Sequence, residues 1–286
     1  MRLIVISGRS GSGKSTALHV LEDAGFNCID NLPAALLPNL VNNISEQQSD
    51  QNIAVSIDAR NASEQLQRFP EFLKQAQQPG LSIEILFLDA RSPILIKRFS
   101  ETRRKHPLSN EERDLKEAVT LESELLDPIA LTADLTIDTS NLSLHQLRDL
   151  IKNRITEKEA PGIALQFQSF GFKHGIPVDV DFVFDVRCLP NPYWKPNLRK
   201  HTGQEQPVID FLSQQEDVQT MLDDITRFIE RWLPKFIANN RSYMTVAIGC
   251  TGGHHRSVFL CEQLYNNFKN KHGNTQLRHR ELNKYS

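Results

Sequence analysis

The run from Gly8 to Ser15 constrains the fold of this chain more than any other feature. It fits the pattern G-x-x-x-x-G-K-[ST], follows the apolar stretch Leu3–Ile6 and precedes a helical pattern at Thr16–Leu21. A strand, a glycine-rich turn and a helix in this order form a phosphate-binding loop, because backbone N–H groups and the positive end of the helix face the anion. The run therefore predicts a nucleotide site on an α/β sheet. Its residues are Gly8, Arg9, Ser10, Gly11, Ser12, Gly13, Lys14 and Ser15.

General P-loop chemistry assigns two side chains of this site and leaves a third open. Lys14 is expected to reach the β- and γ-phosphates, and the Ser15 hydroxyl is expected to lie on Mg²⁺. A carboxylate at the end of a buried strand normally completes such a site, and Asp58 and Asp89 each follow an apolar run. We assign Asp89 to the magnesium together with Ser15. Either carboxylate alone is equally well explained as a cap of the next helix.

Strand-like and helix-like segments alternate through the first half. Strands are expected at Leu3–Ile6, Asn27–Ile29, Ile53–Ile57, Ile83–Leu88 and Asp134–Ile137. Helical patterns lie at Lys14–Ala24, Ala34–Asn43, Ser63–Gln77, Ile94–Lys105, Glu111–Asp127 and Ser143–Arg154. This alternation predicts a parallel sheet with helices on both faces.

Two further segments of the first half suit a small-molecule kinase. A basic cluster follows the fourth expected strand and comprises Arg98, Arg103, Arg104 and Lys105. It fits a lid that neutralises transferring phosphate, or equally a solvated helix face. Asp30–Pro33 lies where small P-loop kinases hold the phosphoryl acceptor, although the start of a helix explains it slightly better. The order of these features resembles the shikimate and adenylate kinase branch of P-loop proteins.

A change of pattern at residues 157–162 divides the chain. A charged run followed by Pro161 and Gly162 ends a helix, so we expect one domain at 1–156 and another at 163–286. Strands are expected at Ile163–Phe170, Phe182–Val186 and Met244–Ile248, and helices at Val218–Ala238 and Ser257–Lys271. The second half is therefore predicted to be a second α/β domain.

The segment Cys250–Ser257 repeats the strand–loop–helix order of the first loop, but it has no lysine equivalent to Lys14. Its spacing is C-x₅-R-[ST], the signature of cysteine-dependent phosphatases, in which a thiolate attacks phosphorus and the arginine holds phosphate oxygens. A helix N-terminus and Arg256, with His254 or His255 if protonated, would lower the pKa of Cys250. Three interpretations stay open: an anion pocket without chemistry, which we favour, a catalytic phosphatase, and a structural glycine turn.

Three basic side chains elsewhere in the second half are candidates for the same pocket. Lys173 and His174 lie in a glycine-flanked turn, and Arg187 follows the strand at Phe182–Val186. Parallel strands bring the turns at their carboxyl ends to one edge of the sheet, where α/β folds bind ligands. A hydrogen-bonded turn residue explains His174 equally well.

Charge and composition limit the remaining classes. The formal net charge is −2, so any nucleic-acid site must be a local patch. Residues 269–286 form such a basic stretch, but charge alone favours an ordinary solubilising terminus over one that binds structured RNA. The scattered cysteines include no C-x-x-C pair, which argues against a zinc site or a disulfide framework. Without a bilayer-length apolar run or a signal peptide, a cytoplasmic protein that does not associate with membranes is expected.

Five motifs together resemble the RapZ/YvcJ family of bacterial nucleotide-binding proteins. They are Ser7–Ser15, Asp30–Pro33, Phe170–Gly175, Asp185–Arg187 with Leu189–Pro192, and Gly249–Gly253 with Arg256 and Ser257. The resemblance extends from Met1 to the end of the chain. It implies that the first domain binds ATP at the P-loop and hydrolyses nucleotide weakly. Mg²⁺ is expected with the nucleotide from P-loop chemistry alone, and the resemblance assigns no role to Asp89. It also implies a GTP site at Asp58, Ala59, Arg60 and Asn61.

The same resemblance implies a role for the second domain. It would bind small regulatory RNA and present it to an endoribonuclease, which controls glucosamine-6-phosphate synthesis, and the chain would form a homo-tetramer. The phosphosugar would be sensed by a pocket of Lys173, His174, Arg187, Cys250, Thr251, Gly252, Gly253, His255, Arg256 and Ser257. The RNA would be bound by Lys269, Lys271, Arg278, His279, Arg280 and Lys284, which reverses the interpretation favoured by charge alone.

The leading hypothesis is thus an RNA-binding adapter regulated by small ligands. The main alternative is a P-loop small-molecule kinase, or a weak ATPase or GTPase, that uses Lys14 and the basic cluster. A third hypothesis makes Cys250 a phosphatase nucleophile.

Overall fold

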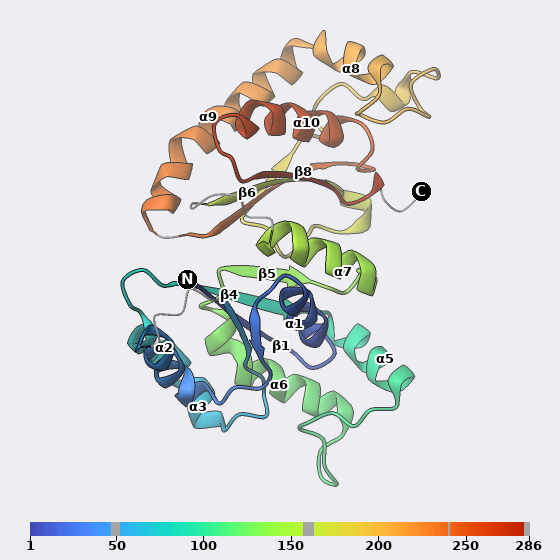
Figure 1. The fold of residues 1–286 in the computed structure, drawn as a ribbon. Helices are drawn as coiled ribbons and strands as arrows, with labels where there is room; N and C mark the ends of the chain where they lie inside the picture. Colours follow the sequence, from blue (N-terminus) through green and yellow to red (C-terminus); the bar gives the residue numbers. More distant parts are fainter. Residues whose placement is uncertain (47–51, 157–162, 240, 283–286) are drawn as a thin grey trace. The chain divides into compact units, whose positions relative to one another are not determined.

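The computed structural model describes residues 1–46, 52–156, 163–239 and 241–282 (Figure 1). The chain divides into two compact units, Met1–Glu157 and Lys158–Ser286. The sequence places the domain limits at 156 and 163, and the residues between these limits lie outside the described part. Each unit is an α/β structure with its own parallel sheet and its own apolar core.

The first unit contains a five-stranded parallel sheet in the order β2-β3-β1-β4-β5. Its strands are β1 (Arg2–Gly8), β2 (Asn27–Ile29), β3 (Ile53–Ser56), β4 (Ser82–Asp89) and β5 (Leu135–Asp138). The parallel α/β fold predicted from the alternating pattern is confirmed. The central strand β1 is buried from Leu3 to Gly8, as expected of a parallel strand covered on both faces.

The helices of the first unit form two groups. They are α1 (Lys14–Asp23), α2 (Leu37–Glu46), α3 (Ser63–Gln67), α4 (Phe69–Ala76), α5 (Ser92–Thr102), α6 (Leu115–Ala130) and α7 (Leu144–Ile151), with short turns at Ala34–Leu36 and Lys152–Thr156. The helices α1 and α7 contact each other, whereas α3, α4 and α5 contact α6. Figure 1 shows α7 and α6 on opposite sides of the sheet.

Two helix limits differ from the sequence-based expectation for local reasons. The helix expected over Ser63–Gln77 is two helices, because Pro70 lacks an N–H and occupies the first turn of α4. Helix α6 begins at Leu115 rather than Glu111. There the Asp114 carboxylate accepts the Glu117 N–H at 2.8 Å, and the Glu117 carboxylate accepts the Asp114 N–H at 3.1 Å.

The second unit contains a four-stranded parallel sheet in the order β7-β8-β6-β9. Its strands are β6 (Ala164–Gly171), β7 (Phe182–Asp185), β8 (Tyr243–Cys250) and β9 (Thr275–His279). Its helices are α8 (Gln206–Ser213), α9 (Glu216–Ala238) and α10 (Arg256–Lys269), with short turns at Phe172–His174 and Pro192–Trp194. The second α/β domain is therefore confirmed. No helix in the described part of the chain is both long and apolar enough to span a bilayer.

The C-terminal stretch differs from the basic tail expected from its charge. Thr275–His279 form β9 and pair with Leu165–Ser169 of β6, so this part of the stretch is an edge strand of the sheet. The sequence Thr-Gln-Leu-Arg-His hides the strand, because it contains a single apolar residue and lacks an alternating apolar face. Lys284 lies outside the described residues.

Candidate functional site

The predicted phosphate loop connects the end of β1 to the start of α1. Gly8 has φ 138°, and a Cβ there would lie 1.9 Å from the Leu88 oxygen of β4, so only glycine fits. Gly13 has φ 111° and directly precedes the first helical residue, Lys14. Arg9 O accepts the Ser12 N–H at 3.1 Å and closes the turn between them. The loop thus has the predicted arrangement, with the N-terminus of α1 at its end.

Lys14 lies against the loop and close to carboxylates. Its Nζ donates to Gly8 O at 2.6 Å. Burial lowers the pKa of Lys14, while the charges of Glu122 and Asp58 oppose this shift. The Ser15 side chain is exposed in the first turn of α1. An ammonium group and an exposed hydroxyl on adjacent residues are the two groups that a P-loop offers to phosphate and to magnesium.

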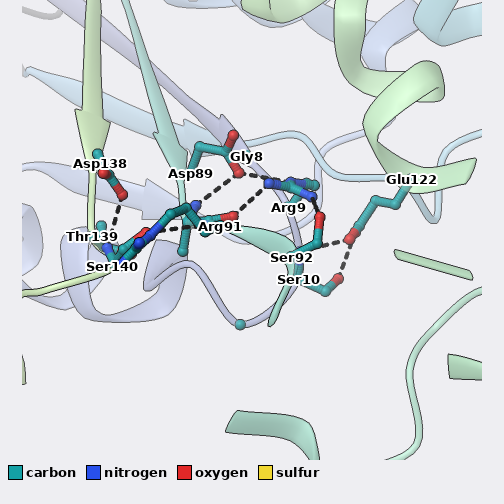
Figure 2. Close-up of polar contacts among 12 residues, drawn as sticks. Gly8, Arg9, Ser10, Asp89, Arg91, Ser92, Glu122, Asp138, Thr139 and Ser140 are labelled. Atoms are coloured by element: carbon teal, nitrogen blue, oxygen red, sulfur yellow. Dashed lines mark hydrogen bonds and ion pairs between the residues drawn. The ribbon is translucent and has the colours of Figure 1, made fainter. Parts of the chain in front are cut away.

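Glu122 of α6 is a loop contact that sequence reasoning missed. Its fully buried carboxylate accepts the Ser10 N–H at 2.9 Å and the Ser10 hydroxyl at 2.7 Å (Figure 2). His106 Nε2 lies 3.0 Å from the same carboxylate, and its Nδ1 accepts the Leu108 N–H at 3.1 Å. The ring proton is therefore on Nε2 and points at Glu122. Burial alone would raise the pKa of Glu122, but the bonds from His106 and Ser10 hold it below its ordinary value.

A sequence signal for Glu122 does exist. The buried side chains of α6 are Ala118, Val119, Glu122, Leu126 and Ile129, which recur at helical spacing on one face. A carboxylate on that apolar face must have a partner inside the protein, because an unpaired buried charge is strongly unfavourable. The pattern predicts a buried polar contact but does not reveal that its partner is the phosphate loop.

Asp89, which we assign to magnesium, is bonded to the loop arginine. Arg9 Nε donates to Asp89 Oδ1 at 2.6 Å, and Arg9 Nη1 donates to Ser92 Oγ at 2.9 Å (Figure 2). The same Asp89 oxygen accepts the Ala90 N–H at 2.8 Å. The magnesium assignment stays a prediction. Among the described residues no group of three or more His, Cys, Asp or Glu side chains is arranged to hold a metal ion.

The stretch predicted to bind GTP lies after β3, the strand next to β1. The Asp58 carboxylate accepts from Arg60 Nη2 at 2.7 Å and from the Arg60 N–H at 2.9 Å. Burial raises the pKa of Asp58, but its bonds with Arg60 and the charge of Lys14 leave it lowered. Asn61 Oδ1 accepts the Ala34 N–H at 2.7 Å. Ala59 is buried between these residues. Because Asp58 interacts with the charge of Lys14, this stretch and the P-loop share one region of the sheet edge.

The segment Asp30–Pro33 reaches the same region through β3. Ser56 Oγ donates to Asp30 Oδ1 at 2.5 Å and accepts the Asn31 N–H at 2.7 Å. Asp30 also contributes to the charge around Lys14. Both the suggested acceptor segment and the suggested GTP stretch therefore lie within electrostatic reach of the P-loop lysine.

Only one residue of the predicted lid cluster contacts the loop. Arg98 Nη1 donates to Gly11 O at 2.9 Å, and its Nη2 donates to Thr139 O at 2.6 Å. Arg103 ends α5 with φ 52°, and it is exposed together with Arg104 and Lys105. Within the predicted cluster, Arg98 therefore contacts the loop, whereas the other three basic residues are solvated.

The second predicted loop connects β8 to α10. Cys250 ends the strand and is buried, and its Sγ accepts the Gly253 N–H at 3.2 Å and lies 3.1 Å from Ser257 Oγ. Burial alone would raise the pKa of Cys250, but bonds to Ser257 and Gly253 and the charge of Arg256 leave it lowered. Burial lowers the pKa of both His254 and His255, so the protonation on which any help from these histidines to Cys250 depends is not favoured.

Residues after β6 and β7 close around this loop. The Lys173 N–H donates to Thr251 O at 3.2 Å. His174 Nε2 lies 3.9 Å from Glu281 Oε2. Arg187 pairs with Asp185 at 2.6 Å, and its guanidinium carbon lies 4.0 Å from the centroid of the Phe172 ring. The pocket residues predicted from three separate segments therefore lie at the carboxyl ends of adjacent strands, as the parallel sheet requires.

Substitution of Gly253 tests how closely the second loop packs against its neighbours. It has φ 77°, and a Cβ there would lie 2.7 Å from Gly171 N and 2.5 Å from Glu281 Cγ. Gly253→Ala is expected to destabilise the second unit by about 2–4 kcal/mol, since it combines a left-handed backbone with a steric clash.

The control is Gly25→Ala, which has a similar φ of 87° but no atom within 4 Å of the added Cβ. It is expected to cost about 1 kcal/mol in its own unit. Urea titration measures both losses of stability when it is followed by hydrogen exchange of the β8 amides for the second unit and of the β1 amides for the first. Equal losses would show that the packing around Gly253 is unimportant.

Most residues predicted to bind RNA are bonded within the protein. Arg280 Nη2 donates to Gly175 O at 2.6 Å, and His279 bonds to Ser169 at 2.9 Å and to Glu262 at 3.1 Å. Arg278 Nη1 lies 3.4 Å from Gln168 Oε1, and burial lowers the pKa of this arginine. Lys269 and Lys271 are exposed. Each of these two lysines bonds to one surface side chain, Lys269 to Asn266 and Lys271 to Glu230 as an ion pair, and they are the exposed members of the set among the described residues.

Comparison with known proteins gives a consistent result over the whole chain. Residues 1–159 match the model of the RapZ-like N-terminal domain, and residues 163–283 match that of the RapZ C-terminal domain. A protein of Pseudomonas putida strain F1 named "Nucleotide-binding protein" is 58% identical over 284 residues, covering 99% of this chain and 100% of the relative. One of the same name from Marinobacter nauticus strain VT8 is 56% identical over 285 residues, covering 99% and 97%.

Solved structures give weaker matches. An unliganded sugar kinase from Janibacter sp. HTCC2649 shares 18% identity and covers 54% of this chain and 91% of its own, with a TM-score of 0.37. A shikimate kinase from Bacteroides thetaiotaomicron shares 14% identity and covers 52% and 98%, with a TM-score of 0.33. The assignment of the α/β fold rests on the strand order described above.

Proposed function

The chain belongs to the RapZ family, and from this membership we propose that it is a nucleotide-binding adapter that delivers small regulatory RNA to an endoribonuclease. In this proposal ATP and GTP bind in the first unit, and a phosphosugar such as glucosamine-6-phosphate binds in the second. The active assembly is a homo-tetramer. The observation that carries the proposal is the match of both units, over nearly the full chain, to the two RapZ domain models.

Two strand–loop–helix sites support the assignment of ligands. The Gly8–Ser15 loop ends at the N-terminus of α1 and holds Lys14, which suits the phosphates of a nucleotide. The Cys250–Ser257 loop ends at the N-terminus of α10 and holds Arg256, which suits a single phosphate group. Adjacent to the second loop, Lys173 adds a further positive charge. Each unit thus has its own anion site, as expected of a protein that integrates two small ligands.

A small-molecule kinase is the second candidate. The contact of Arg98 with Gly11 and the position of Asp30 near Lys14 favour it. A kinase requires nucleotide turnover that one metabolite stimulates strongly. The adapter requires nucleotide binding but no such stimulation, so turnover assays with candidate metabolites separate the two functions.

The RNA-binding role is tested at the two solvent-exposed lysines. Lys269 Nζ contacts Asn266 Oδ1 at 2.7 Å, and Lys271 Nζ contacts Glu230 Oε1 at 2.6 Å, so neither is part of the core. Replacing both lysines by alanine is expected to reduce the slope of log Kd against log salt by about 1.5, because roughly two phosphate contacts are lost. Filter binding of small RNA over a range of salt concentrations measures the slope.

The control is Lys74→Ala on the exposed face of α4, which should leave the slope unchanged. An unchanged slope in the Lys269/Lys271 double variant would remove these residues from the RNA site. Truncation of the chain at residue 269 is not a valid test, because it also deletes strand β9.

A further inference from the structure

The Cys250–Ser257 loop contains a group that anion binding alone does not require, a thiol at its base. Cys250 Sγ accepts the Gly253 N–H at 3.2 Å and lies 3.1 Å from Ser257 Oγ. When the sulfur is ionised, the Ser257 hydroxyl donates to it as well. Two donors directed at one sulfur stabilise a thiolate, which is the nucleophilic form of cysteine.

Comparison with a second buried cysteine shows that burial does not explain this environment. Cys261 lies on α10 and is fully buried, and its pKa is raised well above the ordinary value by that burial. Cys250 is only 3% exposed, yet its bonds with Ser257 and Gly253 and the charge of Arg256 overcome the effect of burial on its pKa. The loop therefore specifically favours the charged form of Cys250.

A second, independent observation concerns Arg256, which is 4% exposed. Its Nη1 donates to Arg187 O at 2.8 Å and to Leu189 O at 2.9 Å. Its Nη2 lies 3.4 Å from Thr251 Oγ1 in the loop, and its buried Nε has no hydrogen-bond partner among the residues that the structure describes.

The side of the Arg256 guanidinium that carries the unpaired Nε–H is suited to bind a phosphate group. In a planar guanidinium group the Nε–H and one Nη2–H point from the same edge, and this edge binds two oxygens of a phosphate in parallel. Nη2, which shares this edge with Nε, contacts Thr251 Oγ1 of the loop at 3.4 Å. A buried donor without an acceptor is unfavourable, so an anion bound in the loop would satisfy it.

Lys173 adds charge near the same position. A Cβ built on Gly252 would lie 3.9 Å from Lys173 Nζ, so the ammonium group lies close to the loop backbone. The N-terminus of α10, a helix of 14 residues, adds its positive dipole end. A dianionic phosphoryl group in the loop would therefore meet several positive groups, with the Cys250 sulfur at its base.

We propose that Cys250 is the nucleophile of a phosphomonoester hydrolase, with small phosphorylated metabolites such as phosphosugars as substrates. This inference rests on the anion site of the proposed function. Sulfur forms a bond to phosphorus as the bond from phosphorus to the ester oxygen breaks, and the leaving oxygen takes a proton from water. A second water molecule then attacks phosphorus, the bond from phosphorus to sulfur breaks, and inorganic phosphate leaves with the thiolate restored.

The other residues of the loop have defined roles in this reaction. Arg256 and the loop N–H groups hold the non-bridging oxygens and stabilise the charge that develops on them. Ser257 is a positioning residue, because it acts on phosphorus only through the Cys250 sulfur.

Hydrolysis of 4-nitrophenyl phosphate by the full chain tests the proposal, because its leaving group needs no proton. Cys250→Ser is expected to lower kcat by about 10³-fold or more, and Cys28→Ser in the other unit should leave it unchanged. Acid quenching of the wild-type reaction should trap one phosphoryl group on the peptide that contains Cys250. Ser257→Ala should raise the pH midpoints of thiol alkylation and of turnover by about one unit.

Calorimetry with inorganic phosphate distinguishes the ways in which the proposal fails. Phosphate binding without turnover, or with equal turnover in wild type and Cys250→Ser, would show that Cys250 is not a nucleophile. The proposed anion site would then be retained. If phosphate does not bind, both the hydrolase and the phosphosugar site of the proposed function are wrong. A pH midpoint unaffected by Ser257→Ala overturns the positioning role of Ser257.

Discussion

Replacement of Lys14 by alanine is expected to weaken the binding of ATP by about 100-fold, which corresponds to the loss of roughly 3 kcal/mol of charge-assisted contact. The Lys14 ammonium lies 2.6 Å from Gly8 O, at the start of the loop. GTP affinity should also fall, because Asp58, in the stretch predicted to bind GTP, interacts electrostatically with Lys14. Titration of a fluorescent analogue of each nucleotide measures both effects.

The matched control for Lys14 is Lys97→Ala. Lys97 is exposed on α5, and its Nζ lies 3.7 Å from Glu101 Oε1, away from the loop contacts. It should leave both affinities unchanged. If Lys14→Ala lowers ATP affinity but leaves GTP affinity intact, the two nucleotides bind at separate positions. If neither affinity changes, the loop is not the nucleotide site.

Glu122→Ala is expected to lower the free energy of unfolding of the first unit by about 3–5 kcal/mol. The substitution leaves the His106 Nε2–H and the Ser10 N–H without an acceptor inside the protein, and it removes a carboxylate near Lys14. Glu124→Ala on the exposed face of the same helix is the control and should change stability by less than about 0.5 kcal/mol. Urea unfolding of both variants measures the difference, and equal losses would show that the buried network is unimportant.

The pH dependence of stability provides a second readout for Glu122. Its pKa is lower in the folded protein than in the unfolded chain, where a glutamate has a pKa of about 4.3. The stabilisation is therefore complete above the unfolded pKa and is lost as pH falls through the folded pKa. The gap in stability between wild type and Glu122→Ala should shrink on acidification. A gap that widens at low pH would contradict this account.

Local signals explain what the sequence predicted. Gly8 and Gly13 are required by positive φ angles or close backbone contacts, and a buried strand and a helix surround them, so the loop is encoded within about 20 residues. The same holds for the second loop, which Cys250 and Arg256 delimit at the ends of β8 and α10. The alternation of strands and helices then predicts the parallel sheet of the first unit.

Long-range contacts explain what the sequence did not predict. Glu122 meets Ser10 across more than a hundred residues, and no local pattern identifies such a partner. Strand β9 is recognisable only through its pairing with β6. Helix α8 is not among the helices expected from the sequence, because a proline such as Pro207 disfavours a helix interior. In the structure Pro207 occupies the first turn of α8, where its missing N–H has no effect. The basic residues of β9 and the arginine that follows it also suggested a solvated tail, although Arg278 and Arg280 contact the protein.

RNA crosslinking to the full-length chain in cells, followed by sequencing of the bound RNA, tests the central claim most directly. The adapter account predicts that one or a few small regulatory RNAs are strongly enriched with the wild-type protein and are depleted with the Lys269/Lys271 double alanine variant. Enrichment no greater than that of a protein without RNA-binding activity would contradict the account and leave the chain as a nucleotide-binding protein with another role.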